Sequence, residues 1–512
     1  LICVVTASRH RLFRPQSRTQ VARASRPLPN AATSASKRSD HEAASFRSFL
    51  GDFLDDVSTV YGVPSGVATI VKLDGCQNVS RCVPTVECVA VGHNVDCDTS
   101  LFRIASISKS FTCTALLQLV DQKQVDLNQC IEEVLPDDLS FDGPSAFFTG
   151  PGGVTPHEAA TQPCIPVHRL LTHSAGLDET WTGSTALSLD DVLPLHEFLR
   201  RAKPLRVSPV GASISYSNYA LALVGFIIQH VSGMSYEEYI RTNILDVIGM
   251  NNTAVGPRDT VFRDWYEHLA PSGLMDPDDF PFSTSSYYIN DVPAGSIAST
   301  GTDMAAYAAT HLRYGLAPNG RRVLSEESSR LMQAAQVGAP LGLGYGFYTE
   351  YLANLTVVQH DGDLPTFASR LFLAHSENLA VFMSFGLGGV PARNQFSCLF
   401  AQKFFSNAST AAPLVLPVPK TVSASAGYPV DSASDLTGQF FNTRVPRADC
   451  WALGARLQDV FYNTKMAPTP GTAKGHTLSM SLSAVSPLSW FVPEWVAAAV
   501  AASHVATFDW AP

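Results

Sequence analysis

The amino-acid sequence predicts an α+β fold in which both ends of one domain build a single antiparallel sheet, with a mostly helical region inserted between them. Two β-rich runs lie early, at 66–75 and 87–93, and three more lie within 355–386. Helical patterns interrupted by Pro/Gly loops occupy about 165–340. One sheet that takes strands from both sides of the helical region explains this order most economically.

The elements before the middle of the chain follow from the spacing of their apolar residues. A helix is predicted over 45–62, because six apolar residues recur there at helical intervals: Phe46, Phe49, Leu50, Phe53, Leu54 and Val57. "GVATIVKLDG" and "ECVAVGH" are typical of strands, and an irregular insert with cysteines separates them. A second helix is predicted from Ser106 and ends near 121–123.

The later elements are predicted in the same way. "YALALVGFIIQHVSG" indicates a helix, and so does "TDMAAYAATHLRYG", with Thr302 or Asp303 as its cap and Gly315 as its stop. The runs "LTVVQHDG", "SRLFLAH" and "LAVFMSFG" indicate three strands, and a helix is expected near 392–406.

The domain organisation follows from shifts in composition. Residues 1–44 form a leader rich in Arg and Ser with no acid before Asp40, which is typical of a transit peptide, although "LICVV" is also consistent with the end of a secretory signal. The main domain is predicted over 45–408. A Pro/Ala/Ser-rich linker over 409–429 and a small β-leaning appendage over 430–512 follow.

The overall composition limits the class of partner. The 512 residues are 46% hydrophobic and 16% charged, as in a globular protein, and the formal net charge is −10. This acidic balance argues against nucleic acid as a partner. No apolar run reaches the roughly 20 residues of a membrane-spanning helix. The oligomeric state is left open.

Cysteine usage gives a hint about the compartment. Cys76, Cys82, Cys88 and Cys97 fall close together, as in a local disulfide cluster, and no Cys-x-x-Cys pair suggests a zinc site. Glycosylation sequons occur at four asparagines: Asn78, Asn251, Asn354 and Asn407. These features favour the secretory pathway, whereas the basic leader leaves a mitochondrion or other organelle as the alternative.

Ser106 and Lys109 are the first candidates for chemistry. A serine hydroxyl is a poor nucleophile until a base removes its proton, and residues three apart on a helix share one face. A helix N-terminus also favours a neutral lysine and an ionised serine oxygen. Because a capped helix followed by a solvated lysine gives the same tetrapeptide, Ser-x-x-Lys alone does not decide.

Two further motifs change that balance. Tyr216-Ser217-Asn218 precedes an apolar helix, and His360-Asp361-Gly362 ends a strand. In this order the three motifs resemble the class C-like branch of the serine β-lactamase and penicillin-binding-protein superfamily, which also holds esterases, D-amino-acid peptidases and the mitochondrial β-lactamase-like protein. The resemblance extends over about 45–405 through segments such as "IPVHRLLTHSAGL" and "VPAGSIASTGTDMAAYA".

The resemblance implies a role for each matching residue. Ser106 is the acylated nucleophile, Lys109 its proton acceptor, and Tyr216 a phenolic base that nearby cations such as Lys109 help to ionise. Asn218 is expected to hydrogen-bond Lys109 and the substrate. The oxyanion hole would consist of the backbone N–H groups of Ser106 and Asp363, with Gly362 beside them. No metal and no cofactor are implied.

Two departures from the family pattern bear on the substrate. His360 stands where many relatives have lysine, and a histidine is mostly neutral at pH 7, so the site lacks a permanent cation for a substrate carboxylate. Asp361 and Asp363 are expected to present negative charge from an edge strand, which suits an amine-bearing substrate. The expected substrate is therefore a small ester, amide or peptide.

Other functions compete with this hypothesis. No Gly-x-Ser-x-Gly elbow and no His-Glu-x-x-His motif occurs, which disfavours an α/β-hydrolase and a zinc peptidase. The rival hypothesis is a catalytically weak scaffold or filament protein that keeps the fold. Structural roles are expected for His173 at a helix end, for Asp303 as a cap and for Cys113 in packing.

Overall fold

The computed structural model describes most of the main domain and four strands near the C-terminus. The described ranges are 36–73, 82–141, 164–179, 183–186, 188–259, 265–272, 287–338, 342–352, 355–387, 389–405, 438–440, 464–468, 477–482 and 505–509.

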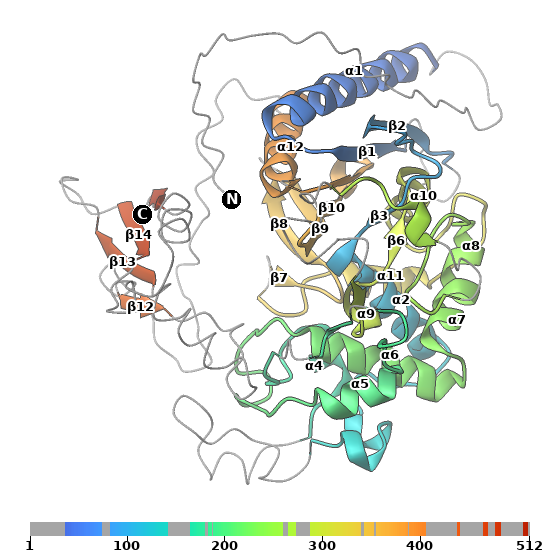
Figure 1. The fold of residues 1–512 in the computed structure, drawn as a ribbon, viewed down its shortest axis with the longest axis vertical. Helices are drawn as coiled ribbons and strands as arrows, with labels where there is room; N and C mark the ends of the chain where they lie inside the picture. Colours follow the sequence, from blue (N-terminus) through green and yellow to red (C-terminus); the bar gives the residue numbers. More distant parts are fainter. Residues whose placement is uncertain are drawn as a thin grey trace.

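A seven-stranded antiparallel sheet forms the centre of the domain (Figure 1). In spatial order its strands are β2 (Thr85–Gly92), β1 (Ser65–Lys72), β11 (Leu379–Phe385), β10 (Phe367–Ala374), β9 (Leu355–Leu364), β8 (Tyr348–Leu352) and β7 (Gly342–Leu343). The early strand β1 pairs directly with the late strand β11, with Gly66 opposite Phe385. The prediction of one sheet from both sides of the helical region is confirmed.

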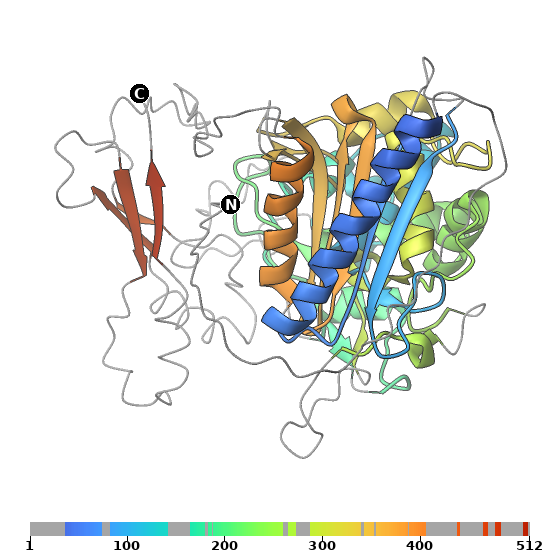
Figure 2. The ribbon, with the colours of Figure 1, turned by 90° about the horizontal axis from the view of Figure 1, so that it is seen from above.

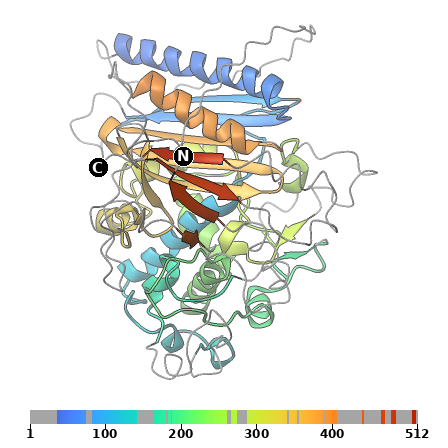
Figure 3. The same cartoon turned by 90° about the vertical axis from the view of Figure 1, so that its left-hand side faces the viewer.

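Two helices cover one face of this sheet, as Figures 2 and 3 show. They are α1 (Ser36–Val60) and α12 (Gly389–Phe404). Phe49 and Phe53 of α1 make edge-to-face ring contacts with Phe396 of α12, at centroid distances of 5.4 and 5.0 Å. Ala68 and Ile70 of β1 face this layer, because side chains alternate along a strand.

The inserted region covers the other face (Figure 1). Its helices are α2 (Ser108–Asp121), α4 (Val167–Leu171), α5 (Leu195–Arg201), α6 (Asn218–Ser232), α7 (Tyr236–Ile240), α8 (Asp246–Ile248), α9 (Val292–Gly295), α10 (Gly301–Leu312) and α11 (Glu326–Gln333). The short elements are β3 (Phe102–Arg103), β4 (Thr185–Ala186), β5 (Tyr288–Ile289), β6 (Ala298–Ser299), the 3₁₀ turns η2 (Ala105–Ile107), η3 (Ile131–Glu133), η4 (Asp137–Leu139), η7 (Trp265–His268) and η8 (His375–Glu377), and the π-turn η6 (Arg241–Leu245).

Helix α6 shows how local sequence sets the boundaries of these elements. The Ser217 hydroxyl accepts a hydrogen bond from the Ala220 N–H at 3.1 Å and caps the first turn. Gly233 ends the helix in the left-handed conformation, at φ 72°. Tyr216 and Asn218 therefore sit at a fixed helix start.

Some predicted boundaries and caps differ in the structure. Helix α1 begins at Ser36, inside the segment predicted as leader. The cap of α10 is Thr300, whose hydroxyl accepts from the Asp303 N–H at 3.1 Å, so the prediction of Thr302 or Asp303 as its cap was wrong. The Asp303 carboxylate instead accepts from the Asn252 N–H and the Thr253 hydroxyl, in a buried position where desolvation raises its pKa to about 6.

The predicted disulfide cluster is confirmed in part. Cys88 pairs with Cys97, within the predicted local cluster, and Cys130 pairs with Cys164. Cys76 lies outside the described residues. Cys113 is free and buried on α2, as expected for a packing residue. The disulfides favour an oxidising compartment.

Near the C-terminus, the described strands β12 (Gly438–Phe440), β13 (Thr464–Pro468), β14 (Thr477–Leu482) and β15 (Val505–Asp509) form a four-stranded antiparallel sheet. The predicted linker over 409–429 lies outside the described residues.

Among the described helices, none is by itself long and apolar enough to cross a membrane. The bent pair Asn218–Ser232 and Tyr236–Ile248 passes the same criterion only when taken together.

Candidate active site

Ser106 and Lys109 lie in direct contact. Ser106 is in the 3₁₀ turn η2, immediately before α2, and the Lys109 Nζ donates a hydrogen bond to the Ser106 Oγ at 3.0 Å. Lys109 is fully buried. Ala105, the residue before the serine, has a positive φ of 50°. This conformation is uncommon for a residue with a side chain and persists only where contacts with the surrounding structure enforce it.

Helix α9 supplies the second contact of Lys109. The Nζ donates to the carbonyl oxygen of Ala294 at 2.6 Å. Asp291, just before this helix, is also buried; burial raises the pKa of its carboxyl to about 6 against the opposing effect of the Lys109 charge. Neither residue carries a signal in the sequence, because only folding brings this segment to Lys109, 185 positions away for Ala294.

The Tyr-x-Asn motif lies beside the same lysine. The Lys109 Nζ lies 4.8 Å from the centroid of the Tyr216 ring, in cation–π geometry. Tyr216 precedes α6, and its neighbour Ser217 caps that helix. The Lys109 amine therefore contacts both the Ser106 hydroxyl and the Tyr216 ring.

Asn218 is held by a glutamate that no sequence motif indicates. Its side-chain amide donates to Glu179 Oε1 at 3.3 Å, and its backbone N–H donates to Oε2 at 3.2 Å. Because Nδ2 is directed to this buried carboxylate, the side-chain oxygen of Asn218 is directed away from Glu179. The expected contact of Asn218 with Lys109 stays a prediction.

His360 lies on β9 with 3% of its surface exposed. Its Nδ1 donates to the Asp361 carbonyl at 2.6 Å. Burial, followed by the charge of Lys109, lowers the pKa of His360 to about 4. The imidazole is therefore neutral at pH 7, and this position supplies no permanent cation for a substrate carboxylate.

Gly362 is where β9 comes closest to the nucleophile's segment. A Cβ at this position would lie 2.1 Å from the Ile104 carbonyl oxygen and 3.2 Å from the Ala105 Cβ. Only glycine permits such an approach of two backbones. Strand β9, which leads to Asp363, therefore packs against the residues that precede Ser106. The two predicted oxyanion donors are the backbone N–H groups of Ser106 and Asp363.

The structure corrects the expectation that Asp361 and Asp363 present unpaired negative charge from an edge strand. The Asp361 carboxylate accepts from Arg370 at 2.5 and 2.8 Å, and the Asp363 carboxylate accepts from Arg393 at 2.6 Å. Strand β9 is also not an edge strand, since β8 and β7 lie beyond it. Arginines pair with both carboxylates, so the charge of this strand does not support the inference of an amine-bearing substrate.

Replacing Asp361 by asparagine is expected to lower the free energy of unfolding by about 3 kcal/mol at pH 7, because the buried Arg370 loses its carboxylate partner. Burial raises the pKa of Asp361, but the hydrogen bonds and charge of Arg370 outweigh it and lower the pKa below the usual 3.8. Its stabilising contribution is therefore complete above about pH 4 and is lost as the pH falls further.

The measurement is urea unfolding of the wild type and Asp361→Asn at pH 7 and pH 3. The difference between them should shrink at pH 3, and an equal difference at both values would contradict the assignment. Glu197→Gln is the matched control. Glu197 also binds two arginines, Arg200 and Arg201, but on the exposed face of α5, so no measurable change is expected.

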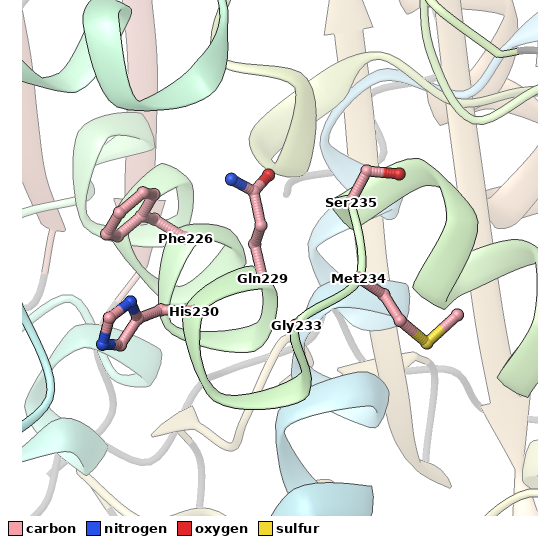
Figure 4. A pocket seen from close by; sticks show the side chains of 6 residues that line it. All are labelled: Phe226, Gln229, His230, Gly233, Met234 and Ser235. Atoms are coloured by element: carbon pink, nitrogen blue, oxygen red, sulfur yellow. The ribbon is translucent and has the colours of Figure 1, made fainter.

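A shallow pocket lies at the other end of α6 (Figure 4). It is lined by Phe226, Gln229, His230, Gly233, Met234 and Ser235. It contains none of the predicted site residues; of these, Tyr216 and Asn218 lie at the opposite, N-terminal end of that helix. Among the described residues, no group of three or more His, Cys, Asp or Glu is arranged to bind a metal ion.

Comparisons with known proteins show the family and the fold of the chain. Residues 90–392 match the family model described as Beta-lactamase. The chain is 27% identical over 317 residues to penicillin-binding protein 4 of Amycolatopsis lactamdurans, covering 60% of this chain and 77% of that protein. It is 28% identical over 347 residues to a D-aminopeptidase of Cereibacter sphaeroides, covering 65% of this chain and 58% of that protein.

A solved structure shares the fold. The D-amino acid amidase from Ochrobactrum anthropi SV3, complexed with L-phenylalanine amide, superposes with a TM-score of 0.53 at 23% identity, over 71% of this chain and 98% of that one. At this level of identity the likeness establishes the fold alone.

Proposed function

Because the chain belongs to the Beta-lactamase family, a family with hydrolases among its members, we propose that it is a serine hydrolase that cleaves an amide, peptide or ester bond through an acyl-enzyme on Ser106. The observation that carries the proposal is the contact between the Ser106 Oγ and the Nζ of a fully buried lysine, Lys109. In its neutral form, a lysine at this position can accept the proton of the Ser106 hydroxyl.

The proposed acylation step balances on these residues. The Ser106 Oγ attacks the substrate carbonyl carbon while its proton passes to Lys109 and from there to Tyr216, and the carbonyl oxygen becomes an oxyanion held by the N–H groups of Ser106 and Asp363. The leaving amine or alcohol departs with a proton supplied through Tyr216. A water molecule then attacks the acyl carbon, the bond to the Ser106 Oγ breaks, and one water proton passes through the base to that Oγ while the hydroxyl leaves with the acyl group as the carboxylic acid.

The substrate class is supported by chemistry at the third motif. The neutral, buried His360 disfavours recognition of a substrate carboxylate at this position. The D-aminopeptidase and D-amino acid amidase among the similar proteins support amides with D-amino-acid units as the first substrates to screen.

The test is intact-protein mass after exposure to a fluorophosphonate, followed by peptide mapping of the adduct. One adduct on Ser106, absent from Ser106→Ala, is expected, together with turnover of D-aminoacyl amides or esters by the wild type. Folded protein without an adduct would reject the hydrolase hypothesis and favour the scaffold hypothesis.

The proposed secretory route is tested by producing the protein in a eukaryotic host. Asn251 is exposed and would carry a glycan on that route.

A further inference from the structure

His173 brackets Tyr216 through the backbone on both sides. Its carbonyl oxygen accepts from the Ser215 N–H at 2.7 Å, and its ring Nδ1 accepts from the Ser217 N–H at 3.1 Å. The two residues that flank Tyr216 are thus tied to one residue, which lies 43 positions earlier in the chain.

The side chain of His173 also contacts the phenol ring directly. The imidazole and the Tyr216 ring stack with centroids 4.3 Å apart and an angle of 28° between their planes. The same phenol ring receives the Lys109 Nζ at 4.8 Å from its centroid. Tyr216 is therefore placed against both the imidazole and the amine that contacts Ser106.

The backbone of His173 is held in an unfavourable conformation. Its φ is 51°, a left-handed value that is unfavourable for a residue with a side chain, and only 4% of its surface is exposed. Because Nδ1 accepts a hydrogen bond from the backbone, the ring is the neutral tautomer with its proton on Nε2. A glycine would relieve the backbone, so the imidazole must account for keeping histidine here.

We propose that His173 is a positioning residue for Tyr216, which orients the phenol toward Lys109 and Ser106 by stacking on its ring and fixing the backbone on both sides. This rests on the proposed function, in which Tyr216 transfers a proton. In this proposal His173 acts through Tyr216. We expect His173 to affect the rate at which the Ser106 hydroxyl reacts, with little effect on the binding of a substrate or of a fluorophosphonate.

The test uses the full chain and the rate of fluorophosphonate labelling at Ser106, separated into a maximal rate and a half-saturating concentration. His173→Gly removes the imidazole and suits the left-handed backbone, so the protein should stay folded. The expected result is a maximal rate about 100-fold lower, as for a catalytic group misplaced by about 1 Å, with the half-saturating concentration unchanged.

A conservative variant should rescue the rate. Asparagine tolerates the left-handed conformation and offers a side-chain oxygen as acceptor for the Ser217 N–H, so His173→Asn should recover to within about tenfold of the wild type, the remainder being the lost ring contact. His173→Phe keeps a ring but no acceptor, and it should label slowly; if the glycine variant proved unfolded, the comparison of Asn with Phe would decide.

The control is Lys123→Gly, because Lys123 also has a positive φ, of 58°, but is exposed beyond the end of α2. Its labelling should equal that of the wild type. Labelling of folded His173→Gly at the wild-type rate would overturn the positioning role alone. Absence of any label on Ser106 in the wild type would overturn the proposed function as well, so the two failures are distinguishable.

Discussion

Replacing Lys109 by methionine is expected to slow acylation of Ser106 by about 10⁴-fold, the upper end of the range for a general base. The Nζ is the group that contacts the Ser106 Oγ, at 3.0 Å, and methionine has a similar volume without an amine. Because Lys109 is fully buried, an apolar side chain of that volume fits its surroundings and the fold should persist. Intact-protein mass gives the labelling rate, and thermal unfolding reports the fold.

A second variant separates the base from the positive charge. Lys109→Arg keeps a cation, but a guanidinium is not deprotonated in proteins, so it should label as slowly as Lys109→Met if lysine acts as a base. Rapid labelling of the arginine variant would show that charge alone suffices. Labelling of Lys109→Met within tenfold of the wild type would remove Lys109 from the mechanism.

Lys203 offers a matched control for this experiment. Its Nζ donates to two backbone carbonyls, those of Asp138 and Ser140, and lies 5.1 Å from the Phe141 ring centroid. Lys109 makes the same two kinds of contact and adds a third, its hydrogen bond to the nucleophile's hydroxyl. Because none of these Lys203 contacts involves Ser106 or Tyr216, Lys203→Met should label at the wild-type rate.

Local patterns in the sequence were sufficient to predict much of the fold. The alternation of strands and the helical spacing near 45–62 depend on neighbours within a few positions, which is why β1, β2, β9, β10 and β11 lie where the sequence predicted them. The Ser106–Lys109 contact is local in the same sense, since i and i+3 share one face of a turn.

The parts that sequence reasoning missed depend on partners far along the chain. Glu179 reaches Asn218 across 39 positions, and the Ala294 carbonyl reaches Lys109 across 185. No spacing rule connects such residues. The left-handed backbone of His173 was not predicted either, although histidine is enriched at such positions together with asparagine and aspartate.

The error over Asp361 is different, because its partner was within reach of a local argument. Asp361 and Arg370 stand directly opposite each other in the β9–β10 hairpin. Opposite charges at such positions attract across the strands. The prediction of a negatively charged site considered the carboxylates of β9 alone. Arg370 on the neighbouring strand and Arg393 on α12 neutralise them.

Replacing Gly362 by alanine should impair both stability and acylation. The new Cβ would meet the Ile104 carbonyl oxygen at 2.1 Å, and this backbone atom cannot move aside as a flexible side chain could. Overpacking of this kind lowers the free energy of unfolding by about 1–3 kcal/mol. Displacement of β9 from the Ser106 segment should lower the labelling rate by about 10²- to 10³-fold, as for loss of one oxyanion donor.

Two other glycines separate these effects. Gly66→Ala on β1 of the same sheet would press on the Phe385 ring at 2.8 Å, so it should destabilise the domain while Ser106 labels normally. Gly51→Ala lies in α1 with nothing within 4 Å of the new Cβ, so it should raise the free energy of unfolding by about 0.5–1 kcal/mol. If Gly362→Ala lost stability but labelled at the wild-type rate, as Gly66→Ala should, β9 would not build the oxyanion hole, and the second donor would have to come from another segment.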